Sequence, residues 1–301
     1  MKKSAKIWCI VAGSMIAVGL CLGIIGGIMG GSSVVARWFA NGELTIGPFG
    51  FRSGTGLSEI EFNEKYPIES GSVVKTELEI IQEIGKIEIQ VGGVRLNIKQ
   101  SEDNTYSYES INAGQYQCYA EGDTLVLRSS DDFGVNADKR EITLYIPYEE
   151  NYDHVGIEIG GGVIETDGIL QANETQINIG AGTLEMQGVN GSRLRVDIGA
   201  GTAQMSNVQI ENADLEVGMG QLIMQGDIRR SLQADCAMGS MQFQIESTQE
   251  SHNYEVDCAM GNIRIGSHSY AGMGMEQTIN NQADSDYSLS CSMGEIKMQF
   301  R

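Results

Sequence analysis

The chain has 301 residues with 39 glycines, only 3 prolines and a formal net charge of -20 at pH 7. Many glycines and few prolines are typical of strands joined by tight turns, and this composition disfavours a helical fold. The negative charge excludes nucleic acid and anionic lipid headgroups as partners, and it leaves cations, neutral polymers and basic proteins.

The segment 7–29 is apolar and uncharged, and as a helix it is long enough to cross a hydrocarbon core of roughly 30 Å. Three lysines precede it, so residues 1–6 are predicted to be cytoplasmic and the rest of the chain extracellular. A cleaved signal peptide and a lipoprotein signal ending at Cys21 are the alternatives. The length of the apolar run, and the bulky Leu20 before that cysteine, favour a single-pass anchor in the cell membrane.

The next part of the chain is divided by where apolar and polar residues begin to alternate. Residues 30–72 show no strong pattern and are predicted to be a juxtamembrane linker. Alternation starts at Val73 and predicts an extracytoplasmic β domain over residues 73–301. Its first part, 73–154, is predicted to be an irregular version of the same β structure, or its cap, with Gly85 at a corner.

The second part, 155–301, repeats a four-residue phrase that starts with an aliphatic residue or cysteine and ends with glycine. The phrases start at Ile159, Ile179, Ile198, Val217, Cys236, Cys258 and Cys291. They end at Gly162, Gly182, Gly201, Gly220, Gly239, Gly261 and Gly294. The steps between these glycines are 20, 19, 19, 19, 22 and 33 residues, and a period near 19 indicates a repeat architecture.

Apolar residues alternate with polar residues on both sides of each phrase, so each unit is predicted to be strand, glycine corner, strand and turn. One unit cannot bury its apolar face alone. We therefore predict a single-domain all-β solenoid, a parallel β-helix-like stack of coils about 4.8 Å apart. The corner glycines are expected to supply either a positive φ or a close approach of neighbouring backbones.

The long step before Gly294 predicts a loop over residues 267–286 that protrudes from the side of the stack. The seventh unit is then expected to close the stack at its open end. Because loops on rigid scaffolds often carry function, Tyr270, Met273 and Met275 are candidate functional residues. A passive insertion is the alternative.

In their order, these features resemble the bacterial family catalogued as DUF4097, described as adhesins with a β-strand repeat. The resemblance rests on the Lys-rich start and Gly-rich span, the strand Ile142 to Pro147, the segment Val155-Gly156-Ile157-Glu158-Ile159-Gly160 and the Gly-x-Gly corners. It covers about Val73 to Arg301 and implies a solenoid displayed outside the membrane of a Gram-positive-type cell. It carries no catalytic residues over to this chain.

Motifs for catalysis or cofactor binding are not found. The glycine phrases lack the following helix and the Gly-Lys-Ser/Thr of phosphate-binding loops. His154, His252 and His268 occupy unrelated places in the repeat and lie in no hydrolase motif. We predict a protein without cofactors that is not an enzyme.

The predicted function is that of a membrane-anchored envelope protein with an adhesive or scaffolding role. Its expected partners are the membrane and envelope proteins or cell-surface polymers. An envelope-stress sensor or regulatory component is one alternative, and a β-helix polysaccharide lyase or hydrolase is another. The lyase is disfavoured because no column of stacked residues combines carboxylates with repeated basic residues.

Sulfur-containing residues recur at two places in the phrase. Cys236, Cys258 and Cys291 are predicted to be small core residues, with a metal site or a disulfide between coils as the alternatives. Met219, Met238, Met260 and Met293 are predicted to fill the core at the corner, with a partner-facing stripe as the alternative. Met186, Met205, Met224 and Met298 are predicted to be core residues.

The residue before each phrase faces outward, and stacking in chain order places four acidic residues in one column. These are Asp197, Glu216, Asp235 and Asp257. Like charges about 5 Å apart repel by roughly 0.8 kcal/mol per pair even in water. The side chains are expected to spread into solvent, and bridging by Ca²⁺, which prefers oxygen ligands, is the alternative.

Overall fold

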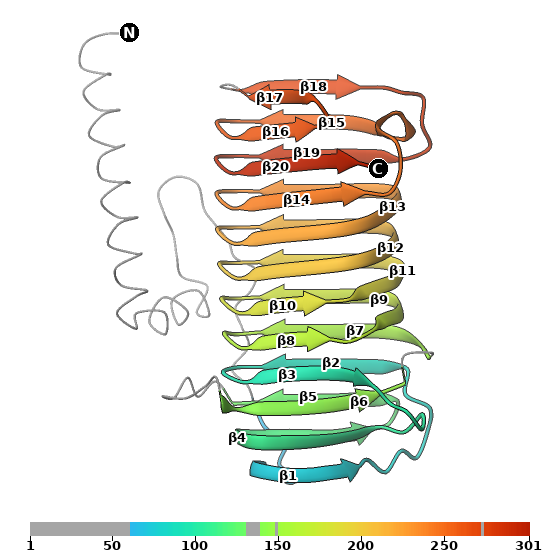
Figure 1. The fold of residues 1–301 in the computed structure, drawn as a ribbon, viewed down its shortest axis with the longest axis vertical. Helices are drawn as coiled ribbons and strands as arrows, with labels where there is room; N and C mark the ends of the chain where they lie inside the picture. Colours follow the sequence, from blue (N-terminus) through green and yellow to red (C-terminus); the bar gives the residue numbers. More distant parts are fainter. Residues whose placement is uncertain (1–60, 131–138, 148–149, 272–273) are drawn as a thin grey trace, which may run out of the picture.

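The computed structural model describes residues 61–130, 139–147, 150–271 and 274–301. They form an all-β domain whose strands wind in stacked coils around one hydrophobic core (Figure 1). The predicted membrane span at 7–29 and Met273 lie outside the described residues. Within the described ranges, no helix is long and apolar enough to cross a membrane.

Each coil contributes one strand before its corner and one after it, and these strands form two parallel ladders along the stack. The upstream ladder contains, in spatial order, β5 (Thr124–Ser129), β2 (Lys86–Val91), β7 (Asn151–Ile159), β9 (Ile169–Ile179), β11 (Gly188–Ile198), β12 (Thr202–Val217), β13 (Gln221–Cys236), β19 (Asp286–Cys291) and β15 (Asn253–Cys258). The downstream ladder contains β6 (Glu141–Ile146), β3 (Arg95–Gln100), β8 (Val163–Thr166), β10 (Thr183–Met186), the first parts of β12 and β13, β14 (Ser240–Ile245), β20 (Glu295–Phe300) and β16 (Asn262–Ile265). The stacked coils predicted from the repeat are confirmed.

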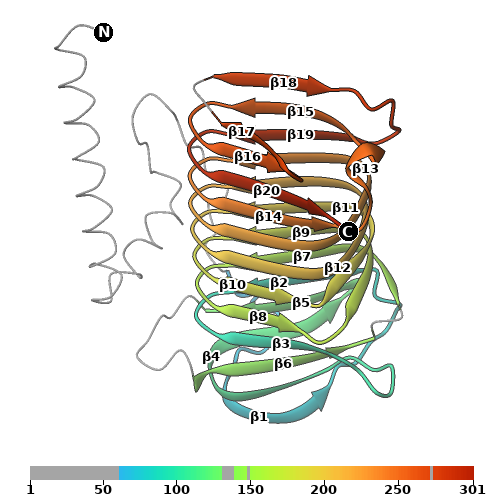
Figure 2. The same cartoon turned by 45° about the horizontal axis from the view of Figure 1, so that its top comes forward.

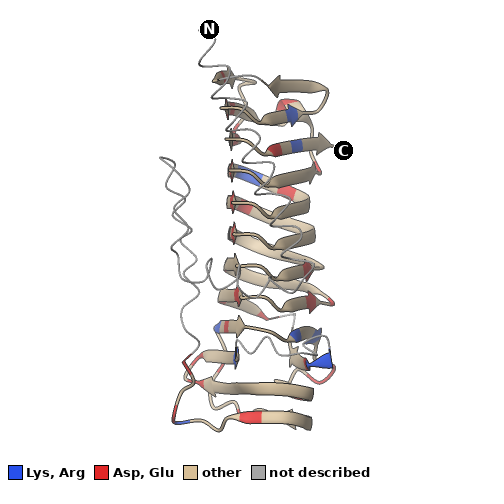
Figure 3. Ribbon diagram, turned by 90° about the vertical axis from the view of Figure 1, so that its left-hand side faces the viewer, with Lys and Arg blue, Asp and Glu red and all other residues tan. Residues whose placement is uncertain are grey.

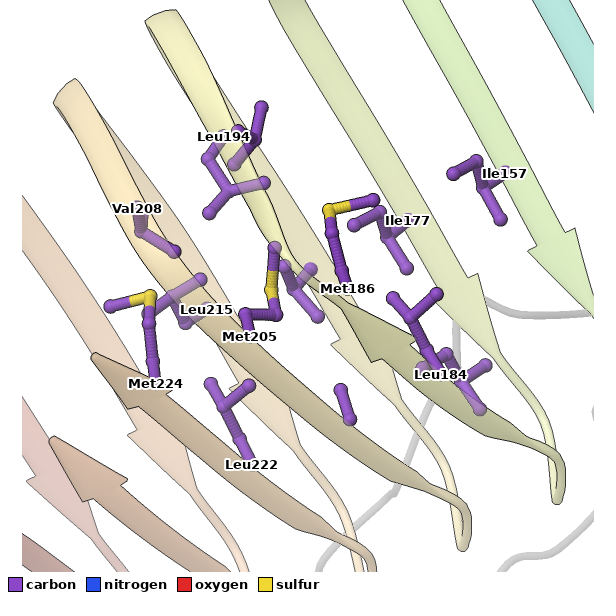
Figure 4. Close-up of a cluster of buried hydrophobic side chains, with 14 of the residues drawn as sticks. Ile157, Ile177, Leu184, Met186, Leu194, Met205, Val208, Leu215, Leu222 and Met224 are labelled. Carbon is purple, nitrogen blue, oxygen red and sulfur yellow. The ribbon is translucent and has the colours of Figure 1, made fainter. Parts of the chain in front are cut away.

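The core consists of ladders of apolar side chains from equivalent positions in successive coils. Leu184 pairs in register with Ala203, Ala203 with Leu222 and Leu222 with Met241, and all four are fully buried. Figure 4 shows Leu184 and Met186 of β10 lying close to Ile177 of β9 between the two ladders. Met186, Met205, Met224 and Met298 are buried, as predicted, and so are Cys236, Cys258 and Cys291.

At the C-terminal end, the coils do not stack in chain order. The last coil, β19 and β20, is inserted between β13/β14 and β15/β16, so the C-terminus lies within the stack (Figure 1). The segment 267–286 is not a lateral loop, because β17 (His268–Ala271) and β18 (Met275–Ile279) pair antiparallel with β16 and β15. An antiparallel cap covers the exposed strand edges but cannot continue the winding, so the chain returns to form a coil farther inside.

The N-terminal end has the same plan in the opposite chain direction. The coil β2/β3 lies between β5/β6 and β7/β8, while β4 (Ser107–Glu121) pairs antiparallel with β5 and β6. β1 (Glu69–Glu77) pairs with β4 and forms the end of the stack in Figure 2. β1 thus begins four residues before Val73, where the alternation in the sequence starts.

Gly85 does not occupy a corner, which corrects its sequence alignment. It precedes β2, and the corner of that coil is formed by Gly92, Gly93 and Val94. Val94 stands where the later phrases end in glycine, since Val163 donates its backbone N–H to the Val94 carbonyl oxygen at 3.0 Å. The coil on the other side of Val94 is β5/β6, whose two strands are not joined by a four-residue phrase.

The seven corner glycines are needed for close approach rather than for positive φ. None of them is among the glycines of the described residues with positive φ, which are Gly71, Gly122, Gly226, Gly266 and Gly274. A Cβ atom on Gly220 would lie 2.6 Å from Cγ2 of Ile198 and closer still to the carbonyl oxygen of Gly201. From Ile159 onward, the first residue of one phrase fills the space that a side chain would need at the last position of the phrase in the next coil.

The cysteines take over this interlocking role in the last coils. A Cβ atom on Gly294 would lie 2.7 Å from Sγ of Cys236, and one on Gly261 would lie 2.5 Å from Sγ of Cys291. Sulfur thus occupies the place that Cγ2 of Ile198 has in an earlier coil. This contact explains why cysteine can replace valine and isoleucine at the first position of the phrase in the last coils.

The corner methionines are exposed, so their assignment to the core is wrong. The exposed fractions are 41% for Met219, 36% for Met238, 49% for Met293 and 60% for Met260. The alternation of inward and outward positions, which locates core residues in a strand, does not hold through a tight corner. The third residue of the phrase therefore points away from the core.

Candidate functional site

The acidic column is shorter than stacking in chain order predicts. Asp197 pairs with Glu216 and Glu216 with Asp235, but Ser290 of the inserted coil lies between Asp235 and Asp257. Figure 3 shows acidic residues recurring on successive coils of the stack. Only three of the four predicted carboxylates are thus direct neighbours.

Partial burial raises the pKa values of Asp197 and Glu216, and neighbouring carboxylates raise that of Glu216 further. Arg195 opposes both shifts. In the part of the chain that the structure describes, no group of three or more His, Cys, Asp or Glu residues is placed to hold a metal ion. Binding of Ca²⁺ by the acidic column stays a prediction.

A groove of about 770 Å³ runs along the outer face of the upstream ladder, next to the acidic column. Polar side chains line it in two parallel rows, which we call the groove rows, and backbone pairing places them one coil apart. The first row contains Glu174, Arg193, Asn212, Ser231, Asp286 and Asn253. The second row contains Gln176, Arg195, Asp214, Gln233, Ser288 and Glu255.

The charged groups of the groove form only loose ion pairs. Arg193 lies 4.0 Å from Glu174, and Arg195 lies 4.0 Å from Asp214, with all four side chains largely exposed. Such pairs contribute about 0 to 1 kcal/mol, so their donors and acceptors are available to a ligand. Together with the amides and hydroxyls, the groove offers both kinds of hydrogen-bonding group along its length.

Sequence reasoning did not single out the groove rows, although a signal for them exists. Their residues lie three and five positions before each phrase, where the alternation places side chains outward. They combine amides, hydroxyls and both signs of charge, so no simple motif marks them. Only the register of six coils brings them into two continuous rows.

The residues singled out in the segment 267–286 belong to the cap. Tyr270 of β17 and Met275 of β18 pack partly buried against the core. The groove is instead lined at this end by Thr278 of β18. The cap thus closes the stack, and it reaches the candidate site through a different residue from those predicted.

The three histidines do not form a common site. His154 lies between Glu88 and Glu174, at 3.6 and 3.8 Å. His252 is buried, with Nε2 2.7 Å from Oγ of Ser247 and Nδ1 2.8 Å from Oγ of Ser285. The ring of His252 also stacks on Tyr287, with 4.1 Å between the ring centroids. This contact joins the turn before β15 to the inserted coil.

Burial lowers the pKa of His252, while the charge of nearby Asp227 has the opposite effect. A histidine in the unfolded chain has a pKa near 6.5, so acid protonates the unfolded state first. We expect the contribution of neutral His252 to the free energy of unfolding to be fully present above about pH 6.5. This contribution should fall as the pH is lowered through the pKa of His252 in the folded protein. The loss is at most about 1.4 kcal/mol per pH unit.

Melting temperatures measured between pH 7.5 and 5.5 check this expectation. Substitution His252→Gln should flatten the pH dependence, whereas the control His268→Gln, at an exposed position, should not. If the melting temperature depends on pH equally steeply in the parent chain and in the His252 variant, a group other than His252 causes the pH dependence. The window lies above the range where most carboxylates titrate.

Comparison with known proteins yields a family and several similar folds. A family model described as Toastrack DUF4097 matches residues 84–297. A structure described as a putative adhesin from Bacteroides fragilis NCTC 9343 is 16% identical, with a TM-score of 0.43 and coverage of 78% of this chain and 98% of that chain. No curated protein sequence matches the chain.

Two structures from Parabacteroides distasonis ATCC 8503 are also similar. One, described as a putative adhesin, is 12% identical, with a TM-score of 0.41 and coverage of 76% of this chain and 97% of that chain. The other, described as a putative lipid binding protein, is 13% identical, with a TM-score of 0.44 and coverage of 76% and 96%. At these identities the likeness concerns the fold alone.

Proposed function

Because the chain belongs to the Toastrack DUF4097 family, we propose that it is a non-catalytic envelope protein that adheres to an uncharged polysaccharide. The segment 7–29 anchors it in the cell membrane and displays the stack on the extracellular side. The groove rows are the binding surface, and their continuity across six coils is the observation that carries the proposal.

The dimensions of the groove suit a linear polymer. Six coils at a spacing of about 4.8 Å give the rows a length of roughly 25 Å. The rows lie on a hydrogen-bonded sheet, so binding requires little ordering of the backbone. A polymer with hydroxyl groups along its length can donate to the carboxylates and amides and accept from Arg193 and Arg195.

The charge of the protein favours an uncharged polymer over an anionic one. The groove rows contain four carboxylates and two arginines, on a chain with a formal charge of -20. A polyanion would be repelled at long range. The mixture of donors and acceptors in the groove rows gives an uncharged polysaccharide hydrogen bonds without that cost.

A lyase or hydrolase is less well supported than adhesion. In the described residues each groove row contains a single arginine, so basic side chains do not repeat along a row. The groove lining of the described chain also includes neither histidine nor cysteine. General acid and base groups are needed for cleavage, and the loose Arg195–Asp214 pair does not position one against the other.

Affinity electrophoresis of the full-length chain in detergent, with neutral glucan, neutral mannan or anionic polygalacturonate in the gel, tests the proposal. We expect retardation by a neutral polymer only, and about tenfold weaker binding for Arg195→Ala combined with Gln233→Ala. Gln242→Ala, at an exposed position of β14 on the downstream ladder, is the matched control. The proposal is contradicted if neither neutral polymer retards the chain. It is also contradicted if Gln242→Ala weakens binding as much as the double variant does. Release of reducing ends favours the enzyme.

A further inference from the structure

The exposed methionines form a single file along the corner of the last four coils, which we call the methionine ladder. Its members are Met219, Met238, Met293 and Met260, in spatial order. Among the described residues, these four are the only methionines with an exposed side chain. Methionine is the third residue of the phrase in these four coils, whereas the earlier coils have Gly161, Ala181 and Ala200 at this position.

Backbone hydrogen bonds hold neighbouring members of the ladder one coil apart. The N–H of Met238 donates to Gly218 at 2.8 Å, that of Met293 to Ala237 at 2.7 Å and that of Met260 to Ser292 at 2.7 Å. Each acceptor is the residue before the neighbouring methionine. The backbones are therefore in register, and the flexible side chains start about 4.8 Å from one another.

The residues next to each member of the ladder in its phrase are small. Each methionine is preceded by a small residue, which is Gly218, Ala237, Ser292 or Ala259, and is followed by a corner glycine. Each of the four side chains is at least about one-third exposed, from 36% for Met238 to 60% for Met260. An unbranched methionine with three rotatable bonds can therefore turn its sulfur toward that of the next coil.

We propose that the methionine ladder is a binding site for a soft monovalent cation, copper(I), held by the thioether sulfurs of adjacent coils. Thioethers are soft ligands that select Cu(I) over Ca²⁺, Mg²⁺ and other hard cations. Binding is simple coordination, in which neutral sulfur donates a lone pair and no proton or electron is transferred. Met238 and Met293 are central, because each has a methionine on both sides.

The charge of the surroundings supports a cation rather than an apolar partner. Glu216 and Asp235 lie three residues before Met219 and Met238, and Glu295 lies two after Met293. These carboxylates raise the local concentration of cations. An apolar partner would find a file only one side chain wide, bordered by charge, which is small for a protein contact.

Titration of the full-length chain, labelled with [methyl-¹³C]methionine, with silver(I) nitrate in chloride-free buffer tests the proposal. Silver(I) is a soft monovalent probe without redox chemistry under these conditions. We expect the methyl signals of the four ladder residues to shift and to saturate at one or two equivalents. The signals of buried Met186, Met205 and Met224 should stay in place and serve as internal references.

Two double variants make the test specific for the order of the ladder. Met238→Leu with Met293→Leu leaves Met219 and Met260 three coils apart, so we expect silver(I) affinity to fall at least tenfold. Met219→Leu with Met260→Leu keeps the adjacent central pair, so the loss should be about threefold or less. Leucine preserves the apolar bulk, and thus only the sulfur is removed.

Several results would overturn the proposal. The ladder is not a thioether site if silver(I) shifts no ladder methyl signal, even when it binds the protein through Cys236, Cys258 or Cys291. The same conclusion follows if the central double variant binds silver(I) as tightly as the parent chain. Equal losses in the two double variants would contradict the adjacency of Met238 and Met293.

Discussion

Substitution of Gly220 by valine is expected to lower the stability of the domain by roughly 3 to 5 kcal/mol, or to prevent its folding. A Cβ atom at this position overlaps Cγ2 of Ile198 and the carbonyl oxygen of Gly201. Neither group can move away, since Gln221 donates its N–H to the Gly201 carbonyl at 3.0 Å and Ile198 is fully buried. Valine adds two methyl groups to this overlap.

Thermal unfolding of the full-length chain in detergent measures the effect. A loss of this size corresponds to a decrease of about 10 °C in melting temperature for a domain of this length. Gly85→Ala is the matched control, because its Cβ would lie 3.5 Å from the nearest atom and its φ is not positive. If Gly220→Val does not accumulate, Gly220→Ala gives the measurement. An unchanged melting temperature would show that neighbouring coils are not in contact there.

The repeat could be read from the sequence because its signals are local. Alternation on both sides of each phrase places the core residues, such as Leu222 and Leu184, and a period near 19 residues identifies the coil. The corner glycines follow from the same alignment. What alignment could not decide was the reason for glycine, since positive φ and close approach require the same residue.

The order of the coils at the two ends could not be read from the sequence. Cys236, Cys258 and Cys291 occupy equivalent positions, so Cys236 fits Cys258 or Cys291 with the same register. The long step before Gly294 reveals an insertion but not its path. The decisive factor is the need to cover the last strand edges, which is a property of the whole stack.

The same limit applies to the candidate sites. The acidic column was found from outward positions, but insertion of Ser290 interrupts it. The groove rows depend on the pairing of Arg195 with Asp214 and of Gln233 with Ser288, which relates residues up to 55 positions apart. The methionine ladder was misassigned because a corner breaks the alternation from which burial is inferred.

Ending the chain after Ser285 is expected to disrupt more than the coil that it removes. The deleted β19 and β20 are the partners that join β13/β14 to β15/β16. A stack in chain order would lose only its last coil. In the observed order, β15, β16 and the cap strands β17 and β18 lose their attachment to the rest of the core.

Hydrogen–deuterium exchange followed by mass spectrometry distinguishes the two orders. In the truncated chain we expect the amides of β15, β16, β17 and β18 to lose protection, while those of β7 to β12 keep it. Protection of residues 253–265 at the level of the parent chain would indicate that β15/β16 packs directly on β13/β14. That result would place the last coil outside the stack.

A pair of point variants tests the same insertion without shortening the chain. Leu289 is buried between Ala234 and Val256, so Leu289→Asp places an unpaired carboxylate between two coils. We expect a loss of about 3 kcal/mol or more. Ser288→Asp, the control, adds the same group on the exposed face of the same strand and should change stability by less than about 1 kcal/mol. If Leu289→Asp causes a large loss of stability and also removes the exchange protection of β13 and β15, then β19 lies between these two strands. A terminal coil would transmit the damage to one neighbour only.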